Sequence, residues 1–190
     1  EDRILPARLL EDLNALRVTK TPYEIACLRE ANRRACRGHA AVLKAFSTGE
    51  YSELDLHLIY LEQTEQDDPE TPYKNIVALN EHAATLHHVS YGRQRSTAQS
   101  LLLDAGATYL GYDSDITRTA VKGEGAVADV FRGLVDGVNR LQLQLCDEAK
   151  TGLNYQALHD RSHHLLADVL KATGMAKTTA SAAALVDGGV

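Results

Sequence analysis

The sequence predicts an α+β fold, and two observations support this prediction. In both terminal parts of the 190-residue chain, apolar residues recur every three to four positions, which is the spacing of an amphipathic helix. In the middle, over residues 75–121, the period shortens to short apolar runs bounded by glycines and polar turns. Strands grouped between pairs of helices favour a curved, largely antiparallel sheet that carries helices on one face.

A long helix is expected over residues 22–46. Thr21 suits the N-cap position, and Glu24, three residues later, supplies the returning acid of a capping box. Pro22 fits the first helical position because the N–H that it lacks has no partner within the helix there. Gly49 offers a stop to this helix.

A second capping box, S-E-L-D at residues 52–55, predicts a shorter helix that ends near Gln66. A polar loop is expected after it, because D-D-P-E-T-P at residues 67–72 combines two prolines with acids and hydroxyls. Such a composition favours neither a helix nor a strand.

Three strands are expected next. N-I-V-A-L at residues 75–79 predicts the first, and S-L-L-L-D-A-G at residues 100–106 predicts the second. The third is predicted by T-Y-L-G-Y-D-S-D-I-T-R-T-A-V at residues 108–121, where Gly106 and Gly111 allow a turn or bulges. An antiparallel hairpin is the simplest connection between the last two strands.

Helical spacing returns over residues 126–150, and Asn154 is expected to cap a last helix that ends near Gly174. The closing run A-L-V-D-G-G-V predicts the start of a further strand. Since the chain begins within a charged amphipathic segment and ends in this apolar run, we expect it to be part of a longer polypeptide.

The composition is that of one globular domain and argues against several partners. The 26 acidic residues outnumber the 20 lysines and arginines, so the chain lacks the basic surplus that nucleic-acid binding uses. No apolar stretch approaches the roughly 20 residues of a membrane span, and the first residues do not resemble a signal segment. We therefore expect a cytoplasmic protein with no nucleic-acid or membrane partner.

The cysteines and the common motifs exclude further classes. Cys27, Cys36 and Cys146 are odd in number and lie far apart in helical segments, which predicts reduced, buried thiols without a disulfide framework. The chain has no glycine-rich nucleotide-binding motif and no G-x-S-x-G elbow.

Three acids, Asp104, Asp113 and Asp115, lie in an apolar run where unpaired carboxylates are costly. If the glycines fold this run back, Asp104 and Asp115 lie in adjacent strands, ~5 Å apart at Cβ. Carboxylates this close repel unless one is protonated or a cation lies between them, so one divalent ion or a pair of ions is one interpretation. A turn or edge position facing water is the other, and we favour it for Asp113.

A histidine-rich segment, H-A-A-T-L-H-H at residues 82–88, is the second concentration of titratable groups. Imidazoles serve both as general acids or bases and as metal ligands. In an extended segment His82 and His88 would share one face and His87 the other. Ordinary surface or core histidines remain the alternative. Other histidines are expected on solvated helix faces: His39, His57, His163 and His164.

Residues 104–119, D-A-G-A-T-Y-L-G-Y-D-S-D-I-T-R-T, resemble the D-x-G…Y-x-S-D-x-T-R-T signature of the pita-bread metallopeptidases. The branch is that of the Xaa-Pro dipeptidases (prolidases) and proline aminopeptidases. Residues 20–31 and 72–88 resemble two further segments of the family. The resemblance implies half of a pita-bread (creatinase/aminopeptidase-like) fold. Residues 1–18 would be a linker or the tail of an N-terminal domain, and residues 19–190 the first half of the catalytic domain.

The resemblance also implies a site. Asp104 would chelate one ion of a dinuclear metal site and Asp115 would bridge both. His87 would contact the substrate and help to stabilise the tetrahedral intermediate, whereas no role is implied for His88, where relatives usually have tyrosine. Thr117 would orient the bridging aspartate through a hydrogen bond. Two divalent ions are implied, with manganese favoured and cobalt or zinc as alternatives.

The implied function is metal-dependent hydrolysis of Xaa-Pro dipeptides by the parent protein, as a homodimer. The alternatives are an Xaa-Pro aminopeptidase acting on longer peptides, a non-catalytic pita-bread binding protein, and a helical interaction domain. Relatives complete the metal site with a histidine in H-G-x-G-H and two glutamates, and this chain contains no such motif. The chain alone is therefore expected to be inactive.

Overall fold

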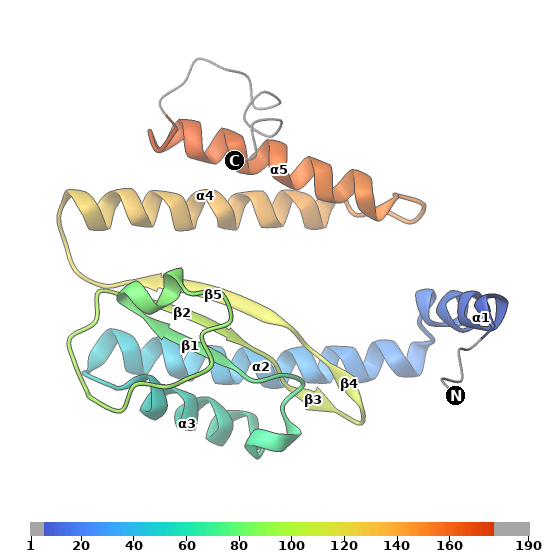
Figure 1. The fold of residues 1–190 in the computed structure, drawn as a ribbon, viewed down its shortest axis with the longest axis horizontal. Helices are drawn as coiled ribbons and strands as arrows, with labels where there is room; N and C mark the ends of the chain where they lie inside the picture. Colours follow the sequence, from blue (N-terminus) through green and yellow to red (C-terminus); the bar gives the residue numbers. More distant parts are fainter. Residues whose placement is uncertain (1–5, 177–190) are drawn as a thin grey trace. The chain divides into compact units, whose positions relative to one another are not determined.

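A computed structural model describes residues 6–176 (Figure 1). They form two compact units that divide after Arg118, and each is described by itself. The first unit begins with the helices α1 (Ala7–Val18), α2 (Pro22–Thr48) and α3 (Glu53–Thr64). Two short 3-10 helices come later, η1 (Asp68–Glu70) and η2 (Asn80–Ala84).

The strands form two small sheets, one with the order β1-β2-β5 and one made of β3 and β4. Strands β1 and β2 are antiparallel, with Ile76 opposite Asp104 and Leu79 opposite Leu101. Strand β5 continues past the boundary of the first unit. The bounds of the strands are β1 (Ile76–Leu79), β2 (Ser100–Ala105), β3 (Thr108–Tyr109), β4 (Tyr112–Asp113) and β5 (Ile116–Val121).

Both predicted capping boxes are present. The Glu24 backbone N–H donates to Thr21 Oγ1 at 3.3 Å, and the Glu24 carboxylate accepts from the Thr21 N–H at 2.7 Å. Ser52 and Asp55 make the same reciprocal pair at the start of α3, at 3.1 and 3.0 Å. Such caps satisfy N–H groups that have no partner within the helix, which explains why the sequence locates both helix starts.

The core of the first unit lies where α2 and α3 pack on each other and on the sheet. Strand β2 alternates strictly, so that Leu101, Leu103 and Ala105 are buried while the residues between them are only half-buried. Asp104 is one of the half-buried residues and therefore projects from the face opposite to the helices. Large side chains fully inside the core include Val42, Leu56, Tyr60 and Val77.

The second unit contains a helix pair, α4 (Ala126–Glu148) and α5 (Tyr155–Ala172). As predicted, Asn154 caps the second helix, with its Oδ1 accepting from the Gln156 N–H at 2.7 Å. An Arg161–Glu148 ion pair at 3.1 Å joins the two helices. Within residues 6–176, no helix is long and apolar enough to cross a membrane.

Some sequence predictions are wrong about burial. His39 and His57 are buried, because α2 and α3 are covered by each other and by the sheet over more of their surface than one apolar stripe. Cys36 and Cys146 are exposed, although Cys27 is buried and all three are free thiols.

Two local predictions also need correction. The segment expected to be a loop at residues 67–72 contains the 3-10 helix η1, started by a capping box between Asp67 and Glu70. The segment treated as extended at residues 82–88 begins instead inside η2, because Asn80 adopts a left-handed φ of 52° and turns the chain. The strand predicted at the end of the chain lies outside the described residues.

Candidate metal centre

Asp104 and Asp115, the two predicted metal ligands, belong to neighbouring strands. Asp104 lies in β2, and Asp115 directly precedes β5, which is next to β2 in the sheet. The chain between them forms the β3–β4 hairpin, whose turn residues Leu110 and Gly111 both have positive φ, at 52° and 79°. Asp113 lies in β4 rather than in the turn, and it is exposed and accepts a hydrogen bond from the Thr108 hydroxyl, as expected for an edge position that faces water.

A close crossing of the backbone sets the distance between the two aspartates. A Cβ at Gly106 would lie 2.1 Å from the Ser114 carbonyl oxygen, so only glycine fits there. The crossing is held by Ser114, whose N–H donates to the Ala107 carbonyl and whose Oγ accepts from the Ala107 N–H, each at 2.9 Å. These bonds fix the residue before Asp115 against the segment that follows Asp104.

Tyr73 joins the two carboxylates. Its hydroxyl oxygen lies 2.8 Å from Oδ1 of Asp104 and 2.8 Å from Oδ1 of Asp115. A phenol carries a single hydrogen, so only one carboxylate can accept it at a time. Burial and the two nearby carboxylates raise the pKa of Tyr73, which keeps the phenol protonated. Two negative groups that share one neutral donor are suited to a cation.

The other two predicted site residues are less constrained. His87 is exposed, has a left-handed φ of 56°, and has no hydrogen-bonding partner among residues 6–176. Thr117 is also exposed, and its hydroxyl makes no hydrogen bond to Asp115 within the same described range. Their roles in substrate contact and ligand orientation therefore stay predictions.

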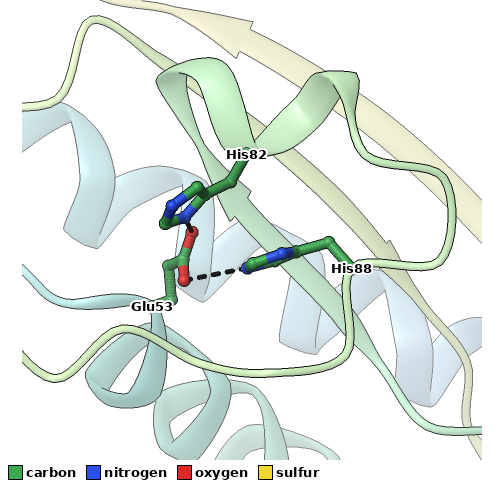
Figure 2. A group of neighbouring side chains, drawn as sticks. All are labelled: Glu53, His82 and His88. Atoms are coloured by element: carbon green, nitrogen blue, oxygen red, sulfur yellow. Dashed lines mark hydrogen bonds and ion pairs between the residues drawn. The ribbon is translucent and has the colours of Figure 1, made fainter.

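The loop that carries His87 is fastened by a carboxylate that sequence reasoning did not select. Glu53, at the start of α3, is 3% exposed, and Figure 2 shows both imidazoles of His82 and His88 directed at it. Its Oε1 accepts from the Leu79 N–H at 2.9 Å and from His82 Nδ1 at 2.7 Å. Its Oε2 accepts from the Gly92 N–H at 2.7 Å and from His88 Nε2 at 3.1 Å.

These contacts decide the protonation of the cluster. Burial alone would raise the pKa of Glu53, but two backbone N–H groups and the two imidazoles outweigh it and hold the pKa below its usual range. The hydrogen bond between His82 and Glu53 also raises the pKa of His82. The sequence predicted that His82 and His88 would share one face of the segment, and the structure brings them closer than that, with their rings stacked at a centroid distance of 4.5 Å. They meet across a 3-10 turn rather than along an extended segment.

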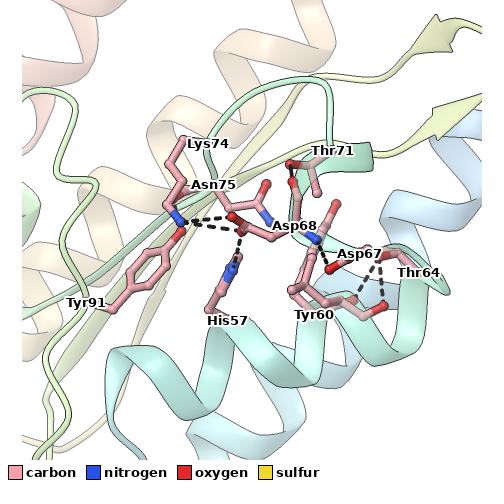
Figure 3. A network of polar contacts seen from close by, with 10 residues as sticks. His57, Tyr60, Thr64, Asp67, Asp68, Thr71, Lys74, Asn75 and Tyr91 are labelled. Carbon is pink, nitrogen blue, oxygen red and sulfur yellow. Dashed lines mark hydrogen bonds and ion pairs between the residues drawn. The ribbon is translucent and has the colours of Figure 1, made fainter.

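A second polar network positions the segment that carries Tyr73 (Figure 3). Asp68 accepts from His57 Nε2 at 2.8 Å and pairs with Lys74 at 3.2 Å. The Lys74 ammonium lies 4.7 Å from the centre of the Tyr91 ring, and the Tyr91 hydroxyl donates to the Asn75 carbonyl at 2.6 Å. The residues that follow Tyr73 are thus tied to both α3 and the His87 loop.

The sequence matches the family described as "Metallopeptidase family M24" over residues 26–181. Similar curated proteins include the Xaa-Pro dipeptidases of Marinobacter nauticus and Yersinia enterocolitica. The first is 42% identical over 184 residues, which cover 96% of this chain and 42% of the relative. The second is 41% identical over 193 residues, which cover 100% and 42%. The chain thus spans about two fifths of the length of the curated relatives that it matches.

Solved structures show the same fold. Proline aminopeptidase P II from Yersinia pestis superposes with a TM-score of 0.76 at 23% identity, over 91% of this chain and 39% of that chain. Zinc-substituted aminopeptidase P of E. coli, in complex with product, gives a TM-score of 0.77 at 23% identity, over 92% and 39%. At this identity the likeness concerns the fold alone, and it confirms the prediction of half a pita-bread fold.

Proposed function

Because this chain belongs to metallopeptidase family M24, we propose that its parent protein hydrolyses Xaa-Pro dipeptides with the help of bound divalent metal. The observation that carries the proposal is the convergence of Asp104 and Asp115 on the single hydroxyl of Tyr73. Relatives named Xaa-Pro dipeptidase, at 41–44% identity, support the choice of substrate.

The donor set fits a pair of hard divalent cations. Asp104 would hold one ion and Asp115 would bridge two, with the remaining ligands supplied by the part of the parent protein that lies outside this chain. Carboxylate oxygens suit manganese, which we favour over cobalt and zinc. When bound, the ions supply Lewis acidity and lower the pKa of water.

The other side chains bind and orient. Tyr73, as a neutral phenol, donates its hydrogen to one of the two carboxylates, Asp104 or Asp115. It thereby holds the two side chains close to each other. His87, exposed on its loop, would donate a hydrogen bond to the scissile carbonyl oxygen as negative charge develops there. The Thr117 hydroxyl would donate a hydrogen bond to Asp115 once bound metal fixes the position of that carboxylate.

We further propose that the parent protein is a cytoplasmic homodimer without a nucleic-acid or membrane partner. The charge of −6 supports the exclusion of nucleic acid. The family resemblance suggests the dimer.

A second candidate is an Xaa-Pro aminopeptidase that acts on longer peptides, and the fold likeness to aminopeptidase P favours keeping it. A non-catalytic binding protein is less consistent with two carboxylates that remain paired on Tyr73. The two enzymes differ in whether a tripeptide Xaa-Pro-Xaa is cleaved faster than the dipeptide Xaa-Pro.

The decisive test uses the full-length protein with Mn²⁺ and compares Ala-Pro with Ala-Pro-Ala. Asp115→Asn should lower kcat/KM more than about 100-fold, since even outer-sphere partners of metal ligands typically contribute 10- to 100-fold. Asp113→Asn is the matched control, because Asp113 is exposed two residues away, and it should change kcat/KM less than about twofold. Equal rates for the two variants would refute the assignment.

A further inference from the structure

The cluster of Glu53, His82 and His88 carries an inference that is independent of the proposed peptidase activity. We propose that these three side chains bind a single Zn²⁺-like ion, at a site that shares no residue with the paired aspartates. This ion fastens the loop that carries His87 to the first turn of α3.

The ligand atoms already converge (Figure 2). Glu53 Oε1 lies 2.7 Å from His82 Nδ1, Oε2 lies 3.1 Å from His88 Nε2, and one ligand atom of each residue lies within 4.8 Å of the other two. Ligands of tetrahedral zinc, each about 2.0–2.2 Å from the ion, stand roughly 3.3–3.5 Å apart. Small side-chain rotations would lengthen these two contacts to that spacing, and the side chain of His82, which is 48% exposed, has room for them.

The ligand types select the metal. Two imidazoles and one carboxylate form a common three-residue zinc set, which leaves a fourth position for water. Imidazole nitrogens favour zinc and its neighbours over magnesium or calcium, which prefer oxygen. The site therefore differs in chemistry from the all-carboxylate pair formed by Asp104 and Asp115.

Two backbone N–H groups orient the Glu53 carboxylate. Leu79 N–H and Gly92 N–H each donate to one oxygen of Glu53, at 2.9 and 2.7 Å. An ion would displace only the two imidazole hydrogens and leave both backbone bonds in place. Metal-binding carboxylates are usually held by such outer contacts.

Charge also favours a cation here. Glu53 is a carboxylate at 3% exposure, so its negative charge needs compensation. Protonating both histidines would place two positive charges side by side, because their rings are stacked at 4.5 Å. One divalent ion supplies the compensation without that repulsion.

Binding would link both ends of the His87 loop. Leu79 and His82 lie before His87, while His88 and Gly92 lie after it, and all four contact the same carboxylate. An ion that joins His82 and His88 to Glu53 thus limits the motion of the residue between them.

The test measures zinc and cobalt binding in full-length protein that carries Asp104→Asn, Asp115→Asn and His163→Gln. The first two changes remove the paired aspartates. The third removes a competing surface pair on α5, where His163 Nε2 lies 3.1 Å from His159 Nε2. Equilibrium dialysis should find one Zn²⁺ that is lost on adding Glu53→Gln. The visible absorption of four-coordinate Co²⁺ should be lost with it.

A second variant and a control keep the outcome clear. His82→Gln changes a half-exposed side chain, so it should fold even if Glu53→Gln does not, and it should weaken zinc binding at least about tenfold. His87→Gln, which alters a neighbouring imidazole outside the cluster, should leave zinc binding intact. Zinc binding that survives His82→Gln and Glu53→Gln unchanged, or that is absent before either change, overturns the proposal.

Discussion

The first unit contains two kinds of carboxylate environment. One is that of Glu53, and the other is that of the pair formed by Asp104 and Asp115. Glu53 is buried and accepts four hydrogen bonds, two of them from backbone N–H groups. The aspartates are more exposed and share one phenol hydrogen. The number of fixed donors thus separates Glu53, whose four acceptor positions are filled within the fold, from Asp104 and Asp115, which share a single phenol hydrogen.

The largest expected effect is on stability, and it should be confined to one side of this comparison. In zinc-free buffer, Glu53→Gln should lower the free energy of local opening by about 3 kcal/mol, because it leaves buried donors without a charged acceptor. Asp115→Asn should change that free energy by less than about 0.5 kcal/mol. Hydrogen exchange of the β1 and β2 amides in the full-length protein measures both.

Equal destabilisation by the two variants would contradict the comparison. It would mean that Asp115 also supports the fold. A control at Glu62, an exposed acid on α3, should behave like Asp115 when changed to glutamine.

A smaller effect is expected at the phenol that joins the two aspartates. Tyr73→Phe removes the hydroxyl that keeps Asp104 and Asp115 in register, so Mn²⁺ affinity of the full-length protein should fall by about 10- to 100-fold. Tyr112→Phe is the matched control, since its hydroxyl donates to Glu24 at 3.3 Å and to no other group within residues 6–176. Calorimetric titration with Mn²⁺ measures the affinity of both variants. Equal Mn²⁺ affinities for Tyr73→Phe and Tyr112→Phe would show that metal binding does not need the shared hydroxyl.

The aspartate side of the comparison could be predicted from the sequence, and the Glu53 side could not. Asp104 and Asp115 are eleven positions apart, so turn chemistry at Gly106 and Gly111 was enough to suggest that they meet. The capping boxes that start α2 and α3 are likewise local signals. Features that depend on residues close together in the chain, such as helix caps and hairpin turns, can therefore be predicted from the sequence.

Glu53 and Tyr73 were missed because tertiary packing brings their partners together. Glu53 lies 26 positions from Leu79 and 39 from Gly92. Tyr73 lies 31 and 42 positions from the two aspartates. Glu53 also had a sufficient local explanation as an acid in the first turn of a helix, where it favours the helix dipole. No spacing rule connects such distant positions.

The smallest expected effect is a pH dependence of stability. It tests whether His82 is protonated when it donates its hydrogen bond to Glu53. The hydrogen bond that His82 donates to Glu53 raises the pKa of His82. The stabilisation from protonated His82 is therefore full below about pH 6.5 and is lost as pH rises through the folded-state pKa. Burial lowers the pKa of His57, so its contribution has the opposite sign and is lost on acidification. In zinc-free buffer, His82→Gln should therefore cost more stability at about pH 5.5 than at about pH 9. Hydrogen exchange of β1 at the two pH values, with NMR titration of both imidazoles, measures this. A cost that is the same at both values would mean that His82 donates to Glu53 as a neutral ring.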